Sequence, residues 1–213
     1  MAAAMSAVPA RFHVCQLADR FNYMLFQIVW FLLDVAVSLV GGACLLRLYM
    51  QRQRVPFGNP IGQLVFALSD WIVLPLRKLM PTRGSWDVPS LVAASALLLL
   101  QMVIGWLLGA AASVLAVPWL ALCGLVKLAL MGMMGILLAY AILSWVQPYS
   151  PIYNVLQRLA DPLLVPIRKI VPLIGNVDLS ALVGMIVLQV GLIVLAHVQA
   201  WGLGAIAMGA MGM

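Results

Sequence analysis

Charged residues are almost absent from most of the chain. Between Asp87 and Arg158 there is a single one, Lys127, and residues 179–213 carry none. About 20 apolar helical residues cross the roughly 30 Å hydrocarbon core of a bilayer. A soluble chain of 213 residues could not cover its surface when only 8% of its residues are charged and glutamate is missing. The sequence therefore predicts an all-α integral membrane protein.

Four segments are long and apolar enough to be transmembrane helices. We expect them at residues 24–46, 88–115, 119–145 and 179–201. Two shorter segments, 61–68 and 152–159, have apolar residues at helical spacing on one face and polar residues on the other. They are too short to span and too one-sided to be buried, which predicts amphipathic helices in the membrane interface.

The chain contains a tandem repeat. The signature from Asp161 to Asp178 matches the segment from Asp70 to Asp87 at a distance of 91 positions without a gap. The matched residues set backbone shape and charge: Pro75 and Pro166, Arg77-Lys78 and Arg168-Lys169, Pro81 and Pro172, Gly84 and Gly175. Each copy has two spans, so the repeats are expected to be parallel and to pack as a four-helix bundle.

The repeat also divides the chain. We expect an N-terminal arm at 1–23, irregular or lying before a translation start at Met24, and an apolar tail at 202–213. The first copy then covers 24–115 and the second 116–201.

Cations are concentrated in the two loops that carry the signature. These are Arg47, Arg52, Arg54, Arg77, Lys78 and Arg83 in the first, and Arg158, Arg168 and Lys169 in the second. The loop between the second and third spans has no charge. The positive-inside rule places both signature loops in the cytoplasm and both termini in the periplasm of a bacterial inner membrane.

Within each signature, the apolar spacing predicts a second interfacial helix that begins at Pro75 or Pro166. The aspartates Asp70, Asp87, Asp161 and Asp178 are expected to cap helices. Two interpretations of the Arg-Lys pairs are open. In the first, the pairs hold the hairpin at the membrane surface. In the second, they bind anionic phospholipids or a partner protein together with Arg158; the residues of the pairs are Arg77, Lys78, Arg168 and Lys169.

Two motifs are Pro-Leu-Arg-Lys-Leu-Met-Pro at 75–81 and Leu-Ala-Asp-Pro-Leu-Leu-Val-Pro-Ile-Arg-Lys-Ile-Val-Pro at 159–172. They resemble the paired motifs of the bacterial YggT family. The resemblance extends over residues 24–201, with Trp71 where the first motif usually has proline. It implies an inner-membrane protein associated with osmotic or extracytoplasmic stress. Plastid relatives are associated with cofactor assembly of a cytochrome complex or with nucleoid and division organisation, and no catalytic residue carries over.

Two charges fall inside predicted spans, Asp34 and Lys127. An isolated charge at the centre of a span costs about 2.5–3.5 kcal/mol on insertion scales, which favours pairing. The repeat places the two residues at similar depth in equivalent spans, so we predict an intramembrane ion pair. A proton or ion path and separate snorkelling of the two side chains are the alternatives.

The sequence shows no nucleophile with a base, carboxylate dyad, phosphate loop or metal-ligand spacing, so neither an enzyme nor a cofactor is expected. We predict an assembly or stress factor that binds membrane lipids or a membrane protein complex, and no nucleic acid. Self-association into homo-oligomers is also allowed. The alternative is a small oligomeric ion or solute channel or transporter that uses Asp34 and Lys127.

Overall fold

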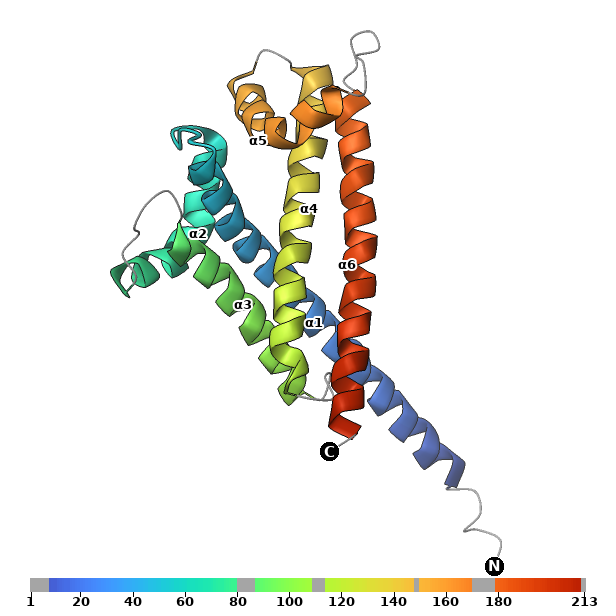
Figure 1. Cartoon of the computed structure of the whole chain (residues 1–213). Coiled ribbons are helices and arrows are strands. Elements are labelled where there is room, and N and C mark those ends of the chain that lie inside the picture. Colours follow the sequence, from blue (N-terminus) through green and yellow to red (C-terminus); the bar gives the residue numbers. More distant parts are fainter. Residues whose placement is uncertain (1–7, 80–86, 109–113, 148–149, 170–178, 212–213) are drawn as a thin grey trace, which may run out of the picture. The chain divides into compact units, whose positions relative to one another are not determined.

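The computed structural model describes residues 8–79, 87–108, 114–147, 150–169 and 179–211. These residues form six helices (Figure 1): α1 Val8–Arg52, α2 Pro60–Leu79, α3 Val88–Leu107, α4 Ala116–Val146, α5 Pro151–Arg168 and α6 Leu179–Met211. The chain divides into two compact units, Met1–Ala36 and Val37–Met213. The second unit holds the last part of α1 and all of α2–α6.

Four of the helices in the described part of the chain are long and apolar enough to cross a membrane. They are Met24–Arg52, Val88–Leu107, Ala116–Val146 and Leu179–Gly209. The prediction of an all-α multi-pass membrane protein with four spans is confirmed.

Both ends of the chain are more helical than predicted. The helix α1 begins at Val8, so residues 8–23 continue the first span as helix and do not form an irregular arm. At the other end α6 continues to Met211, through most of the expected tail. Residues 202–211 are uncharged, and an apolar segment keeps its backbone hydrogen bonds by remaining helical where no water is available.

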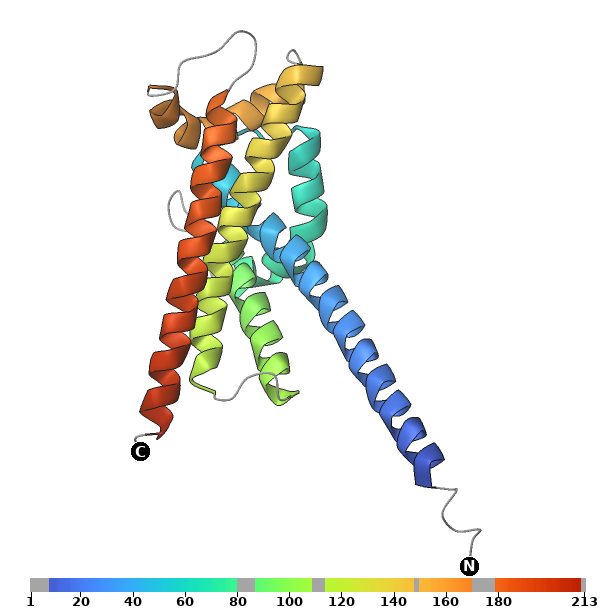
Figure 2. The ribbon, with the colours of Figure 1, turned by 90° about the vertical axis from the view of Figure 1, so that its right-hand side faces the viewer.

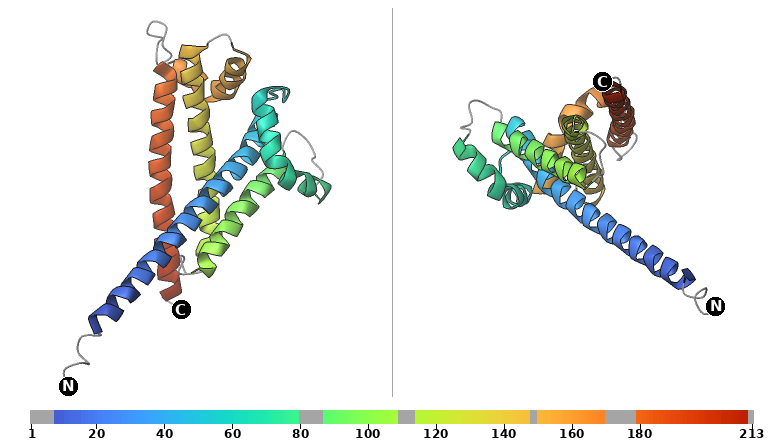
Figure 3. Two further views of the ribbon diagram at one scale, coloured as in Figure 1. Left: turned by 180° about the vertical axis from the view of Figure 1, so that it is seen from behind. Right: turned by 90° about the horizontal axis from the view of Figure 1, so that it is seen from below.

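The prediction of two separate interfacial helices per signature is wrong. The helix α2 is continuous with Pro75 inside it, and α5 is continuous with Pro162 and Pro166 inside it. Both bend along their length (Figures 1 and 3), as expected where proline removes a backbone hydrogen bond. The apolar face continues in register through the prolines, so its burial offsets the lost bonds. Whether these helices lie in the membrane interface stays a prediction.

The helix α4 is the centre of the second unit. It packs against α3, α5 and α6, and it runs side by side with α6 in both views of Figures 1 and 2. The helices α3 and α6 run in one direction and α4 runs in the other, which agrees with the expected parallel repeats (Figure 2). The core between α4, α5 and α6 is built from Leu137, Tyr140, Leu156, Ala160, Leu164, Ala181 and Leu188.

Positions 91 residues apart are buried alike. Val65 and Val73 of α2 are buried, and so are their counterparts in α5, Leu156 and Leu164. The cluster of Met50, Val55, Val65, Val155 and Leu159 then joins α1 and α2 of the first copy to α5 of the second. The two copies thus bury equivalent faces and share one core.

Close contact between α4 and α6 leads to a prediction at Gly202. A Cβ atom at this position would overlap the indole ring of Trp119, which donates from Nε1 to the Gln199 carbonyl at 3.3 Å. We expect Gly202→Ala to lower the free energy of unfolding by about 1–3 kcal/mol through overpacking. Gly204→Ala is the matched control, because its Cβ would meet nothing within 4 Å, and it should raise stability by up to about 1 kcal/mol through helix propensity. Unfolding in detergent micelles measures both, and equal effects would contradict the packing.

Candidate functional site: a buried arginine–aspartate cluster

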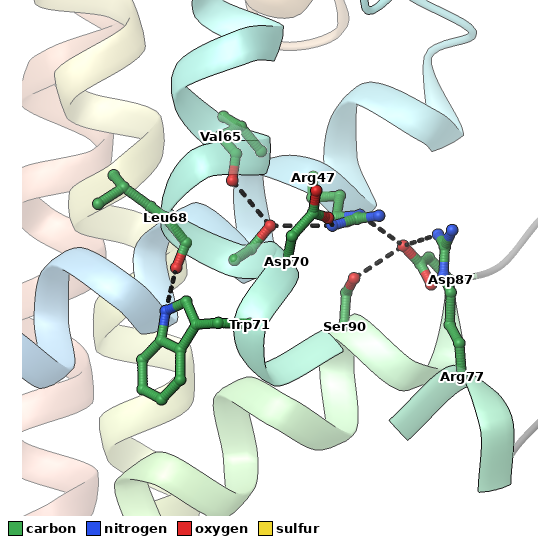
Figure 4. A network of polar contacts seen from close by, with 9 residues as sticks. Arg47, Val65, Leu68, Asp70, Trp71, Arg77, Asp87 and Ser90 are labelled. Carbon is green, nitrogen blue, oxygen red and sulfur yellow. Dashed lines mark hydrogen bonds and ion pairs between the residues drawn. The ribbon is translucent and has the colours of Figure 1, made fainter. Parts of the chain in front are cut away.

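Arg47 lies near the end of α1 and is only 3% exposed. Its Nη1 donates to Ser69 Oγ at 3.0 Å and to Asp70 Oδ1 at 2.6 Å, both on α2 (Figure 4). Ser69 in turn donates from Oγ to the Val65 carbonyl at 2.7 Å. The guanidinium also lies 4.6 Å from the centre of the Phe66 ring, a cation–π distance. One arginine therefore fastens α1 to the middle of α2.

The same arginine faces α3. Asp87, immediately before α3, is fully buried, and its Oδ2 lies 3.5 Å from Arg47 Nε. That oxygen accepts from Arg77 Nη2 at 3.0 Å and from Ser90 Oγ at 2.7 Å (Figure 4). Asp87 occupies the N-cap position of α3, where its carbonyl accepts from the Leu91 N–H, but its carboxylate caps no backbone group. We call Arg47, Ser69, Asp70, Arg77, Asp87 and Ser90 the polar cluster.

The polar cluster balances two cations against two anions. Removing charges from water costs several kcal/mol per ion, which is repaid only by close pairing. The pairing is incomplete: three buried atoms, Arg47 Nε, Arg77 Nε and Asp87 Oδ1, have no hydrogen-bond partner among the described residues. Such a cluster is sensitive to the loss of a buried charge. It holds three helices together at one end of the first copy.

The second copy has apolar residues at the corresponding positions. Leu138, Ala160 and Ala181 stand where the first copy has Arg47, Ser69 and Ser90. There Arg168 lies 3.3 Å from Asp161 Oδ1, within the same helix, and donates to the Tyr140 hydroxyl at 2.7 Å. Asp178, the counterpart of Asp87, lies outside the described residues. Within the part of the chain that the structure describes, the buried Arg47 arrangement thus belongs to the first copy alone.

Sequence reasoning missed Arg47, which we had counted among the loop cations. The signal was present, because positions 47, 69 and 90 are all polar where their repeat partners are all apolar. Sequence reasoning also misassigned Asp70 and Asp161 as helix caps. Both lie inside helices and face arginines.

The two Arg-Lys pairs share one feature, although their arginines pair with aspartates that do not correspond under the repeat. In each, the arginine is partly buried against a carboxylate, Arg77 with Asp87 and Arg168 with Asp161. The lysine that follows, Lys78 or Lys169, is exposed, as is Arg158 on α5. The two arginines thus make contacts within the fold, whereas Lys78, Lys169 and Arg158 are exposed.

The predicted ion pair of Asp34 and Lys127 stays a prediction. Asp34 belongs to the unit of residues 1–36 and Lys127, exposed on α4, to the unit of residues 37–213. Among the described residues, no group of three or more His, Cys, Asp or Glu side chains could hold a metal ion.

Comparison with known proteins decides the family. The CCB3/YggT family model matches two segments, residues 26–108 and 119–199. The chain belongs to the CCB3/YggT family. In Escherichia coli K12 the family member "Uncharacterized protein YggT" is 37% identical over 162 residues, which cover 75% of this chain and 85% of that protein.

Two further relatives come from other bacteria. "Uncharacterized protein in proC 3'region" of Vibrio alginolyticus is 36% identical over 75% of this chain and 88% of its own length. "Uncharacterized protein" of Haemophilus influenzae is 33% identical over 71% of this chain and 82% of its own length. No solved structure matches this family member. The resemblance noted from the motifs is confirmed.

Proposed function

We propose that this protein is a non-catalytic assembly or stress factor of the bacterial inner membrane. It acts by binding anionic lipids or a membrane protein complex through two exposed lysines, Lys78 and Lys169. The stress is osmotic or extracytoplasmic. Both lysines lie on the cytoplasmic side in this proposal, and both termini lie in the periplasm.

One observation carries the proposal: both copies expose the lysine of an Arg-Lys pair whose arginine is held by an aspartate within the fold. Each arginine is held by an aspartate at 3.0 or 3.3 Å, and the next lysine is exposed. A lysine presented from a rigidly held helix end suits phosphate or carboxylate recognition, since its ammonium is a compact charge on a long stem. Near an anionic surface such a lysine contributes about 1 kcal/mol.

Site-specific photo-cross-linking in native membranes tests the binding. Leu74 and Val165 are exposed, lie one helical turn before Lys78 and Lys169, and correspond under the repeat. A photoreactive residue at either position is expected to capture the same protein or an anionic phospholipid reproducibly. Exposed Val126, in a span, is the control for ordinary lipid contact. Adducts identical to those from position 126, or none, would overturn the proposal.

Charge reversal provides the functional prediction. In a strain that lacks the gene, Lys78→Glu combined with Lys169→Glu is expected to abolish growth rescue under osmotic or envelope stress. The variant should accumulate normally, because both residues are exposed. Arg54→Glu reverses an exposed cation outside the Arg-Lys pairs and should still rescue growth. Full rescue by the double variant would contradict the role of the lysines.

A further inference from the structure

An apolar groove of about 410 Å³ lies between the last part of α1 and the middle of α4. Both walls belong to the unit of residues 37–213. The volume lies in the range of about 300–1,000 Å³ that is usual for small-molecule sites. The lining includes Leu39, Gly42, Leu46, Leu128, Gly132 and Met133.

Two glycines keep the groove open. A Cβ atom at Gly132 would meet nothing within 4 Å, and one at Gly42 would touch only Leu128, at 4.0 Å. The glycines are therefore not required by close packing of α1 on α4. They leave space at the centre of the groove.

The length of the groove fits one leaflet of a bilayer. Along α1 it extends from Ser38 to Tyr49, which is about 16 Å at the rise of an α-helix. Half of a 30 Å hydrocarbon core is about 15 Å. The end at Tyr49 lies at the end of the spanning segment, beside Arg47 and Arg52.

A polar pocket follows at that end. Gln53 donates from its backbone N–H to the Tyr49 carbonyl at 3.0 Å, so the two residues are one turn apart. Gln53, Arg158 and Asp161 line a pocket of about 450 Å³. Asp161 already faces Arg168, and Arg158 gives the pocket an exposed positive charge. The cationic pocket thus begins one turn beyond the Tyr49 end of the groove, between Gln53, just after α1, and α5.

We propose that one anionic phospholipid occupies this site, with an acyl chain in the groove and its phosphate at Arg158. An α-helix about 10–12 Å wide is too bulky to enter a groove of this volume, whereas a single hydrocarbon chain suits its length. The inference deepens the proposed function and rests on its lipid binding, because it names the lipid class and adds Arg158 to the two lysines.

Lipid photo-cross-linking tests the site. The full chain is reconstituted in vesicles of phosphatidylethanolamine and phosphatidylglycerol, with a trace of phosphatidylglycerol that carries a diazirine in one acyl chain. Adducts are expected on groove residues such as Leu128 and Met133. Gly132→Leu fills the groove and should reduce them about tenfold, which corresponds to the lost burial of about two methylene groups. Arg158→Gln should reduce labelling by phosphatidylglycerol more than labelling by a matching phosphatidylcholine probe, because the choline cation already neutralises that phosphate.

Gly135→Leu is the matched control. It lies on the same helix, outside the groove, and its Cβ would also meet nothing within 4 Å, so its labelling should equal that of the wild type. Unchanged labelling of Gly132→Leu, or an equal loss in Gly135→Leu, would overturn the inference. So would cross-linked dimers of the chain in place of lipid adducts. None of these results depends on cross-linking from positions 74 and 165, so the proposed function can fail separately.

Discussion

Arg47→Leu is expected to lower the free energy of unfolding by about 3–5 kcal/mol, the usual effect of removing one partner of a buried ion pair. Leucine is the residue at the corresponding position of the second copy, position 138, so its size and apolar character are compatible with the scaffold. The loss arises because Asp87, fully buried, keeps Arg77 as its one cationic partner within the polar cluster. Ser69 Oγ also loses its arginine donor.

Denaturation in detergent micelles, followed by helix content, measures the change. Arg54→Gln is the control, because Arg54 is exposed and its replacement should stay within about 0.5 kcal/mol of the wild type. A stability of Arg47→Leu equal to that of Arg54→Gln would show that the buried arginine contributes nothing to the first copy.

Asp87→Asn is the second substitution with a large expected effect. The amide keeps the size of the carboxylate but leaves Arg47 and Arg77 facing a neutral group, and Arg47 is only 3% exposed. Arg47 then keeps only the 40% exposed Asp70 as its anionic partner within the polar cluster, and removing one partner of a buried ion pair costs about 3–5 kcal/mol. The same unfolding experiment measures it.

Asp70→Asn is the matched control within the polar cluster. The Asp70 side chain pairs with the same arginine at 2.6 Å but is 40% exposed, so water screens the charge that remains. Its loss should cost about 1 kcal/mol or less. If Asp70→Asn were as damaging as Asp87→Asn, burial would not be the source of the effect.

Much of the fold could be predicted from the sequence because the membrane allows few alternatives. Uncharged stretches such as 88–107 have to be helices, and the four spans follow from length and charge. Helix ends were harder to predict. Pro166 suggested a helix start, yet α5 continues through it because Leu156, Leu159 and Leu164 share one buried face. Burial of that face outweighs the local preference of proline.

The candidate site was predicted less well, since it depends on which residues of three helices meet. Arg47 was assigned to a loop because cations usually end spans. Its partners Ser69 and Asp87 are 22 and 40 positions away and meet it only in the folded chain. Comparison of the two copies, with Leu138 at the position of Arg47, is the one sequence signal that points to it.

The central claim is that a buried charge cluster holds α1, α2 and α3 together. The double-mutant cycle of Arg47→Leu and Asp87→Asn tests this claim most directly. Coupled residues give interaction energies of about 0.5–3 kcal/mol. We expect the double variant to be less unstable than the sum of the single variants by about 1–3 kcal/mol, because each single change leaves a buried charge that the other removes. Additive effects within about 0.5 kcal/mol would contradict the cluster.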